Sequence, residues 1–243
     1  MLRRTVRMLM SVIVMTGAII GVGATSGTAH AAGCYTWNRT LSEGSSGADV
    51  TQLQIRVAGW VTSGERLSYD GVYGARTAAA VKKFQSAYGL PADGVAGSQT
   101  FSKIYALQDA DCTPVHFAYS ELNKCNSDWS GGAVSAVTAK ANALKTMWKL
   151  EAMRHALGDV PITISSGFRS YACNSVVGGA STSRHLYGDA ADLTGSPSFC
   201  TLAKEARVHG FSEILGPGYP DHNDHAHVAL DPSPYWSAPN CGI

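Results

Sequence analysis

The chain has 243 residues, of which 45% are hydrophobic and 15% are charged, and its formal net charge is +1. A chain of this length can bury one or two hydrophobic cores. Because the net charge is close to zero, the composition gives no support to a nucleic-acid-binding protein or to a surface that binds charged membranes.

The N-terminus has the features of a secretory signal peptide. Three arginines within the first seven residues precede an apolar stretch over about residues 8–22, and Ala29-His30-Ala31 has the small-x-small form of a signal peptidase site. The apolar stretch is short and is interrupted by glycine, which argues against a membrane anchor. We therefore predict that residues 1–31 are a signal peptide and that the mature protein is secreted.

Six cysteines in an exported chain favour three disulfides. The preferred pairs are Cys34–Cys112, Cys125–Cys173 and Cys200–Cys241. The first pair brackets the first half of the chain, whereas the other four cysteines allow three pairings. A lipoprotein with Cys34 lipidated is an alternative, because Ala31-Ala32-Gly33-Cys34 loosely resembles a lipobox, but it would leave an odd number of cysteines.

Residues 41–107 contain an internal near-repeat. Residues 70–77 and residues 93–100 both begin with Asp-Gly-Val and end with Thr, so each copy places an Asp-Gly turn before a predicted helix. Apolar residues spaced by three and four form one face of each helix. These faces consist of Val50, Leu53 and Val57 in one helix and of Val81, Phe84 and Tyr88 in the next. The pattern predicts a small three-helix unit.

Several short motifs in this segment match a known cell-wall module. They include Gly47-Ala48-Asp49-Val50, Asp70-Gly71-Val72-Tyr73-Gly74, Gly89-Leu90-Pro91 and Asp93-Gly94-Val95. Together they resemble the peptidoglycan-binding domain type 1 over about residues 41–107. The resemblance implies a helical domain that binds the wall polymer. A helical spacer that binds nothing is the alternative.

A linker over about residues 108–118 separates this unit from a second domain at 119–243. The pattern predicts a long helix from about Gly132 to Ala156. Its predicted apolar face consists of Val134, Val137, Ala141, Leu144 and Trp148. Ile162 and Ile164 then alternate with polar residues, which indicates a strand. The second domain is therefore expected to be of the mixed α+β class.

Five of the eight histidines lie between His185 and His227, and four of these five fall in two clusters, at 183–192 and 221–228. Catalytic zinc takes three nitrogen or oxygen ligands and keeps one position open for water. His185 and Asp192 can supply two ligands if the chain folds back between them at Gly188. His227 can supply the third. His225 would share a strand face with His227, so spacing alone leaves open which of these two binds.

The two clusters also match a known peptidase pattern. The matching residues are Ser183-x-His185-x-x-Gly188-x-Ala190-x-Asp192, Asp224-His225-x-His227 and Ser166-Gly167-Phe168-Arg169-Ser170. They resemble the M15 family of zinc D-Ala-D-Ala carboxypeptidases over about residues 115–243. The resemblance implies an α+β zinc peptidase domain with a small antiparallel sheet, of the Hedgehog/DD-peptidase type.

The resemblance also implies roles for individual residues. One Zn²⁺ per chain would be held by His185, Asp192 and His227. Arg169 would hold the C-terminal carboxylate of the substrate, and Ser183 would be a second substrate-binding residue. An ordinary structural ion pair is the alternative for Arg169.

The motif leaves two candidates for the general base. Many members of the superfamily have a glutamate three residues before the last ligand, whereas this chain has the shorter Asp224 there. His222 and Asp224 are therefore both candidates for the catalytic base, and they could share the work.

The expected function is that of a secreted zinc metallopeptidase, extracellular or associated with the cell wall, that hydrolyses the terminal D-alanyl-D-alanine bond of peptidoglycan stem peptides. Peptidoglycan is the expected partner, with no nucleic acid and no membrane after processing. The alternatives are a zinc endopeptidase that cuts a cross-bridge or L-Ala–D-Glu bond, and a wall-binding protein without activity. A serine enzyme is disfavoured, because the chain has neither Ser-x-x-Lys nor Gly-x-Ser-x-Gly.

Overall fold

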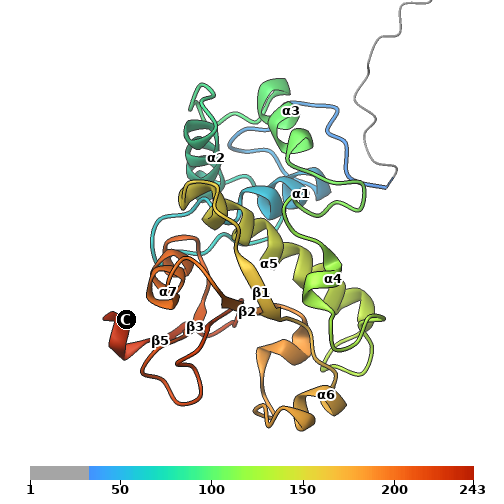
Figure 1. The fold of residues 1–243 in the computed structure, drawn as a ribbon. Coiled ribbons are helices and arrows are strands. Elements are labelled where there is room, and N and C mark those ends of the chain that lie inside the picture. Colours follow the sequence, from blue (N-terminus) through green and yellow to red (C-terminus); the bar gives the residue numbers. More distant parts are fainter. Residues whose placement is uncertain (1–32) are drawn as a thin grey trace, which may run out of the picture.

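The computed structural model describes residues 33–243, so the predicted signal peptide lies outside the described residues. The N-terminal module consists of three helices (Figure 1), α1 (Ala48–Val57), α2 (Ala75–Ala87) and α3 (Ser98–Ala106). The predicted apolar faces are confirmed, because Val50, Leu53 and Phe84 are almost completely buried in one core, and Tyr88 is half-buried against it.

The internal repeat is also a repeat of structure. Gln54 Nε2 donates to Asp70 Oδ1 (2.8 Å), and Gln54 Oε1 accepts from the Gly71 backbone N–H (3.0 Å). Gln85 makes the same two bonds, of 3.0 Å and 2.9 Å, to the Asp-Gly turn of the second copy. Each buried glutamine therefore fastens a helix to the turn that starts the next helix, which satisfies polar groups that would be costly to leave unpaired.

The long helix α5 (Ala136–Ala156) lies between the module and the rest of the chain (Figure 1). Trp148 and Ala152 belong to the core of the module, whereas Met147, Leu150 and other residues of α5 belong to the core of the second domain. One helix thus contributes to two cores. The predicted apolar face was wrong in part, because Val137 is 81% exposed.

The start of α5 also differs from the prediction, which placed it near Gly132. The helix begins after Ser135, whose hydroxyl accepts a hydrogen bond from the Thr138 backbone N–H. An N-cap of this kind satisfies an N–H group that has no partner within the helix. The prediction placed the start of the helix too early because Val134, which precedes the cap, also packs against this core and extends the hydrophobic pattern.

The second domain contains a five-stranded sheet with the order β1-β2-β4-β3-β5. The first four strands pair antiparallel, and β5 pairs parallel with β3. The strands are β1 (Thr163–Ser166), β2 (Ala190–Thr194), β3 (Glu213–Leu215), β4 (Ala226–Ala229) and β5 (Tyr235–Ser237). The predicted strand at Ile164 is confirmed, since this side chain is buried and Thr163 beside it is exposed. The domain is α+β, as expected.

Short helices surround this sheet. They are α4 (Tyr119–Leu122), α6 (Tyr171–Val176), α7 (Phe199–Val208) and the 3₁₀ helices η1 (Arg184–Tyr187) and η2 (Pro239–Cys241). Both α5 and α7 contact the sheet, and their buried residues share its core. Within the described part of the chain, no helix is long and apolar enough to cross a membrane.

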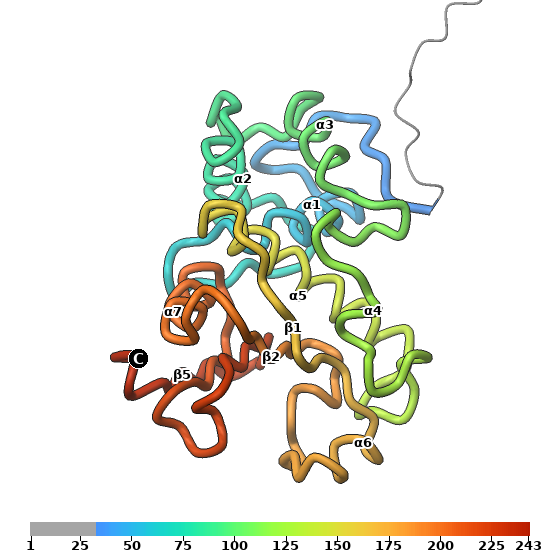
Figure 2. The backbone as a smooth tube through the Cα atoms, viewed as in Figure 1, coloured from blue at the N-terminus to red at the C-terminus, as the bar shows by residue number. Residues whose placement is uncertain are grey.

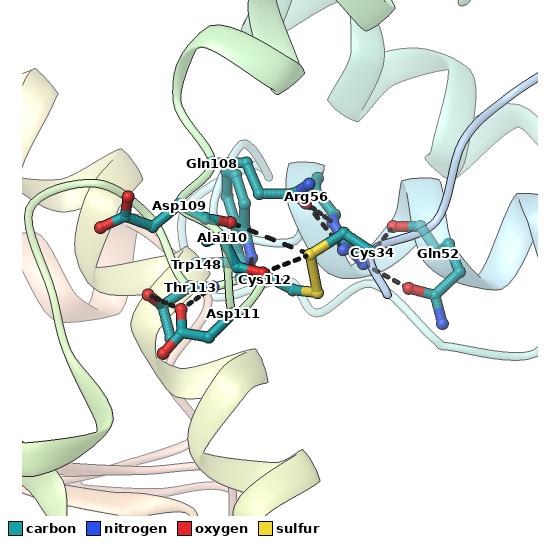
Figure 3. Close-up of a disulfide and its surroundings, with 10 residues drawn as sticks. All are labelled: Cys34, Gln52, Arg56, Gln108, Asp109, Ala110, Asp111, Cys112, Thr113 and Trp148. Atoms are coloured by element: carbon teal, nitrogen blue, oxygen red, sulfur yellow. Dashed lines mark hydrogen bonds between the residues drawn. A yellow bond between two sulfur atoms is a disulfide. The ribbon is translucent and has the colours of Figure 1, made fainter. Parts of the chain in front are cut away.

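All three predicted disulfides are present, at Cys34–Cys112, Cys125–Cys173 and Cys200–Cys241. The first joins the start of the described chain to the connection between α3 and α4 (Figure 3), and the backbone tube shows these two segments next to each other (Figure 2). This connection is also held to α5, because the indole Nε1 of Trp148 donates to the Cys112 carbonyl (3.2 Å). The predicted linker is therefore fastened at both its module side and its peptidase side.

Candidate metal centre

Two of the predicted metal ligands lie opposite each other in the sheet. Asp192 in β2 and His227 in β4 are directly paired in the antiparallel register, which brings their side chains within reach on one face. His185 lies in η1, just before β2. The chain folds back between His185 and Asp192 at Gly188, as predicted, and Gly188 adopts the left-handed conformation with φ of 75°.

Gly188 also has no room for a side chain. A Cβ atom there would lie 2.5 Å from the Ala139 carbonyl oxygen, in the first turns of α5. Both the left-handed backbone and the close approach require glycine. The glycine of the motif therefore brings His185 back toward β2, and its own chemistry takes no part in the site.

The three predicted ligands converge on one point. His185 Nε2 lies 3.1 Å from Asp192 Oδ1, and His227 Nδ1 lies 2.9 Å from that oxygen and 3.1 Å from His185 Nε2. All three side chains are buried. Two imidazole nitrogens and one carboxylate oxygen in a small cluster match the ligand set of a catalytic zinc site. The donor set therefore fits a zinc ion.

The nitrogen of each histidine that faces away from the cluster has its own hydrogen-bond acceptor. His185 Nδ1–H donates to the Gly167 carbonyl (2.6 Å), and His227 Nε2–H donates to Glu213 Oε1 (2.9 Å). Such outer partners select the tautomer whose other nitrogen has a free lone pair. His185 thus presents Nε2 to the cluster and His227 presents Nδ1.

The electrostatics of the cluster hold the aspartate in its charged form. Burial acts to raise the pKa of Asp192, but the contacts with His185 and His227 outweigh it and lower the pKa well below the usual range. Burial lowers the pKa of His185, which favours the neutral imidazole that binds a metal. Burial also acts to lower the pKa of His227, but the hydrogen bonds to Asp192 and Glu213 raise it to about 9.

The cluster opens into a cavity of about 660 Å³. The cavity is lined by Ser183 and by residues of the loop after α6, between Val177 and Thr182. Tyr219 and His222 also line it. The three predicted ligands therefore line a cavity, while their side chains remain buried.

Comparison with known proteins agrees with this site. The family described as "Peptidase M15" matches residues 115–229, and the "Putative peptidoglycan binding domain" matches residues 46–104. The chain is 62% identical over 252 aligned residues to the zinc D-Ala-D-Ala carboxypeptidase of Streptomyces albus G, and the alignment covers 99% of both proteins. The chain belongs to the M15 peptidase family.

Other relatives of this M15 peptidase share only part of its length. A spore cortex-lytic enzyme of Bacillus cereus is 42% identical over 65 residues, which cover 26% of this chain and 24% of the relative. A probable N-acetylmuramoyl-L-alanine amidase of Bacillus licheniformis is 38% identical over 79 residues, which cover 31% of this chain and 22% of the relative. These matches concern a segment of the peptidase and not its whole architecture.

Arg169 contacts Asp192, one of the three predicted metal ligands. Its Nη2 donates to Asp192 Oδ2 (2.6 Å), and its Nε donates to Ser166 Oγ (3.0 Å). The guanidinium also lines the cavity, and Nη1 makes no hydrogen bond to any residue that the structure describes. The ion pair that the sequence left as an alternative is therefore present.

The two predicted catalytic residues lie in different surroundings. His222 lines the cavity, and its Nδ1–H donates to the Pro220 carbonyl (2.6 Å), so Nε2 is left available. The carboxylate of Asp224 is 90% exposed and does not line the cavity. Instead, Asp224 Oδ1 accepts from His225 Nδ1–H (2.8 Å). Any contribution of Asp224 to the site must therefore pass through His225.

The sequence left open whether His225 or His227 binds the metal, and it assigned no role to Glu213. His225 Nε2 lies 3.6 Å from Asp192 Oδ1, on the same side as His227, as alternation along a strand predicts. Glu213 lies outside both motifs and contacts His227 only because β3 pairs with β4. The histidine pattern offered a signal for His225, whereas nothing in the sequence pointed to Glu213.

Proposed function

We propose that this M15 peptidase is a zinc carboxypeptidase that removes the terminal D-alanine from peptidoglycan stem peptides outside the cell. The observation that carries the proposal is the buried cluster of His185, Asp192 and His227 in a chain 62% identical to a zinc D-Ala-D-Ala carboxypeptidase. The cluster supplies three ligands and faces a cavity that is open to solvent. This is the arrangement of a catalytic metal site, because a structural zinc site has four protein ligands.

Zinc, when bound, supplies Lewis acidity that activates water and polarises the scissile carbonyl. The protein's own part is to hold the ligands with fixed tautomers and to keep Asp192 ionised. The outer partners fix which nitrogen of each histidine faces the cluster, and metal binding displaces the proton that His227 still carries there. The buried ligands therefore need little rearrangement to bind a divalent cation.

Arg169 is proposed to hold the terminal carboxylate of the substrate. Its guanidinium lies beside Asp192 and lines the cavity, and Nη1 has no partner within the described chain. Arginine binds carboxylates through two parallel N–H donors, which fixes the direction of the bound peptide. A peptide held by its C-terminus would place its last amide bond beside the metal ligands. Ser183, which also lines the cavity, is proposed as a second contact with the peptide.

His225 and His222 are proposed to handle the protons of the reaction. His225 Nε2 lies 3.6 Å from a metal-binding oxygen, and the Asp224 carboxylate orients its ring from the solvent side. His222 lies next to it, with 4.8 Å between the ring centroids. We propose that His225 Nε2 accepts the proton of the attacking water and that Asp224 acts as its positioning residue. His222 is proposed to act in its protonated form, in which Nδ1–H donates to the Pro220 carbonyl and Nε2–H donates to the substrate oxygen as negative charge develops there.

The helical module is proposed to hold the enzyme on the wall polymer. The family match at residues 46–104 supports this role. The core shared through α5 fixes the module relative to the cavity, because Trp148 and Ala152 pack into the module from a helix of the peptidase domain. Wall binding by the module would therefore present the cavity at a constant distance from the polymer.

Mass analysis of products from defined muropeptides tests the proposal. We expect purified mature protein to remove only the terminal D-alanine from a pentapeptide stem, to lose activity with a strong chelator and to regain it with zinc. Products cut within the cross-bridge or at the L-Ala–D-Glu bond would contradict the carboxypeptidase assignment. Full activity without metal would contradict the zinc site itself.

A further inference from the structure

Glu213 is an acidic residue that contacts a metal ligand from the side opposite the cluster. It begins β3, and in the register of β3 with β4 the residue opposite His227 is Leu215, so Glu213 lies diagonally across from the histidine. Long side chains reach such diagonal neighbours in a sheet. Glu213 Oε1 accepts a hydrogen bond from His227 Nε2–H at 2.9 Å, and the glutamate side chain is 21% exposed.

The geometry excludes Glu213 as a direct ligand. His227 Nδ1 faces Asp192 and His185 at 2.9 Å and 3.1 Å, whereas Nε2 faces Glu213, so the imidazole ring separates the glutamate from the cluster. Among the described residues, the group whose ligand atoms lie close enough to hold one metal ion contains the other three side chains without Glu213.

We propose that Glu213 is a positioning residue for the metal site, a role that rests on the zinc function proposed above. By accepting the proton on Nε2, it keeps the lone pair of His227 on Nδ1, directed at the cluster. The carboxylate also holds the ring in one orientation and makes the imidazole a stronger electron donor to the metal.

The two histidines of the metal site differ in the group that orients the imidazole ring. His185 is oriented by the Gly167 backbone carbonyl, which is neutral and which no side-chain substitution removes. His227 is oriented by a charged side chain on a neighbouring strand. Removing Glu213 therefore affects one ligand selectively, and the register of β3 against β4 becomes a determinant of metal affinity.

Two variants separate the charge from the hydrogen bond. Glu213→Ala removes both, whereas Glu213→Gln keeps an acceptor oxygen at the same reach. Glu205→Gln is a matched control, because Glu205 lies 3.6 Å from the non-ligand His209. Competition with a chromophoric chelator gives the zinc Kd of each protein. We expect the Kd to rise about 10–100-fold in Glu213→Ala and less in Glu213→Gln, and to stay within twofold of wild type in the control.

A second readout separates positioning from general stability. Thermal unfolding of the metal-free proteins should give nearly equal Tm values for wild type and Glu213→Gln, and the visible spectrum of the Co²⁺-loaded variants should shift because the ligand geometry changes. An unchanged zinc Kd in Glu213→Ala, with tight binding by wild type, would overturn the positioning role alone. Absence of zinc binding by wild type would overturn the proposed function as well.

Discussion

In the helical module, the polar residues of the repeated motif bond to one another, whereas in the peptidase domain the polar residues of the motif converge on an open cavity. Gln85 and the Asp93-Gly94 turn satisfy each other within the module. His185 and Asp192 instead present their atoms to a common point beside solvent. A motif rich in polar residues is therefore not by itself a sign of a binding site, because its hydrogen-bond partners decide what it does.

The largest expected effect comes from breaking the metal cluster. His185→Ala removes one of the three proposed ligands, so we expect loss of stoichiometric zinc and a fall in kcat/KM of at least about a thousandfold, since a catalytic metal contributes several kcal/mol. Metal analysis and peptide hydrolysis check this, with His155→Gln as a histidine control outside the cavity. All three disulfides should still form. Full turnover in the metal-free variant would contradict the site.

In the helical module, we expect a substitution of a buried polar residue to lower stability without lowering the activity of the folded protein. Gln85→Leu leaves the buried Gly94 N–H and its neighbours without partners, so we expect a loss of about 2–3 kcal/mol in the free energy of unfolding. Gln99→Leu, the same change at an exposed position of α3, should stay within about 0.5 kcal/mol of wild type. Chemical denaturation measures both. Hydrolysis of a soluble peptide should not change in either folded variant. A large loss of activity in Gln85→Leu would contradict a purely structural role for the polar residues of the module.

A substitution of Arg169 tests whether this residue recognises the C-terminal carboxylate of the substrate. In Arg169→Lys, we expect kcat/KM to fall about 10–100-fold for peptides with a free C-terminal carboxylate and clearly less for amidated peptides, because lysine lacks the two-pronged donor. The contact with Asp192 is also changed by this variant, so the zinc Kd should be measured in parallel. Equal losses on both peptides would show that Arg169 acts only through Asp192.

The smallest expected effect is a pH dependence of stability that arises at the boundary between the helical module and the peptidase domain. His209 is buried there, and its Nδ1–H donates to the Gly59 carbonyl (2.7 Å). Burial lowers its pKa to about 4, against about 6.5 when unfolded, so the unfolded chain binds more protons between these values. Stability should therefore fall as the pH drops through this window, by about 1 kcal/mol between pH 7 and pH 5.5.

His209→Asn checks this prediction, because asparagine can donate to the same carbonyl but does not titrate. Denaturation at several pH values should show a smaller loss of stability in the variant than in wild type. Identical pH profiles would mean that the boundary between the module and the peptidase domain does not contribute to acid sensitivity.

Local patterns predicted much of this molecule. Apolar spacing identified the helix faces of the module, and the cysteine positions suggested pairs that the structure contains. The histidine motif identified ligands that do cluster, because the turn at Gly188 links two of them locally. Periodicity failed on α5, since a helix buried on two sides has no single apolar stripe for the pattern to detect.

By itself, the sequence determined the elements whose causes are local: the turns that need glycine, the amphipathic helices and the ligand types available for a metal. The tertiary structure alone decided which groups meet across strands. The contact of Glu213 with His227 and the exposure of the Asp224 carboxylate both depend on strand register and on the path of a loop. Those are properties of residues far apart in the chain, and no spacing within one motif encodes them.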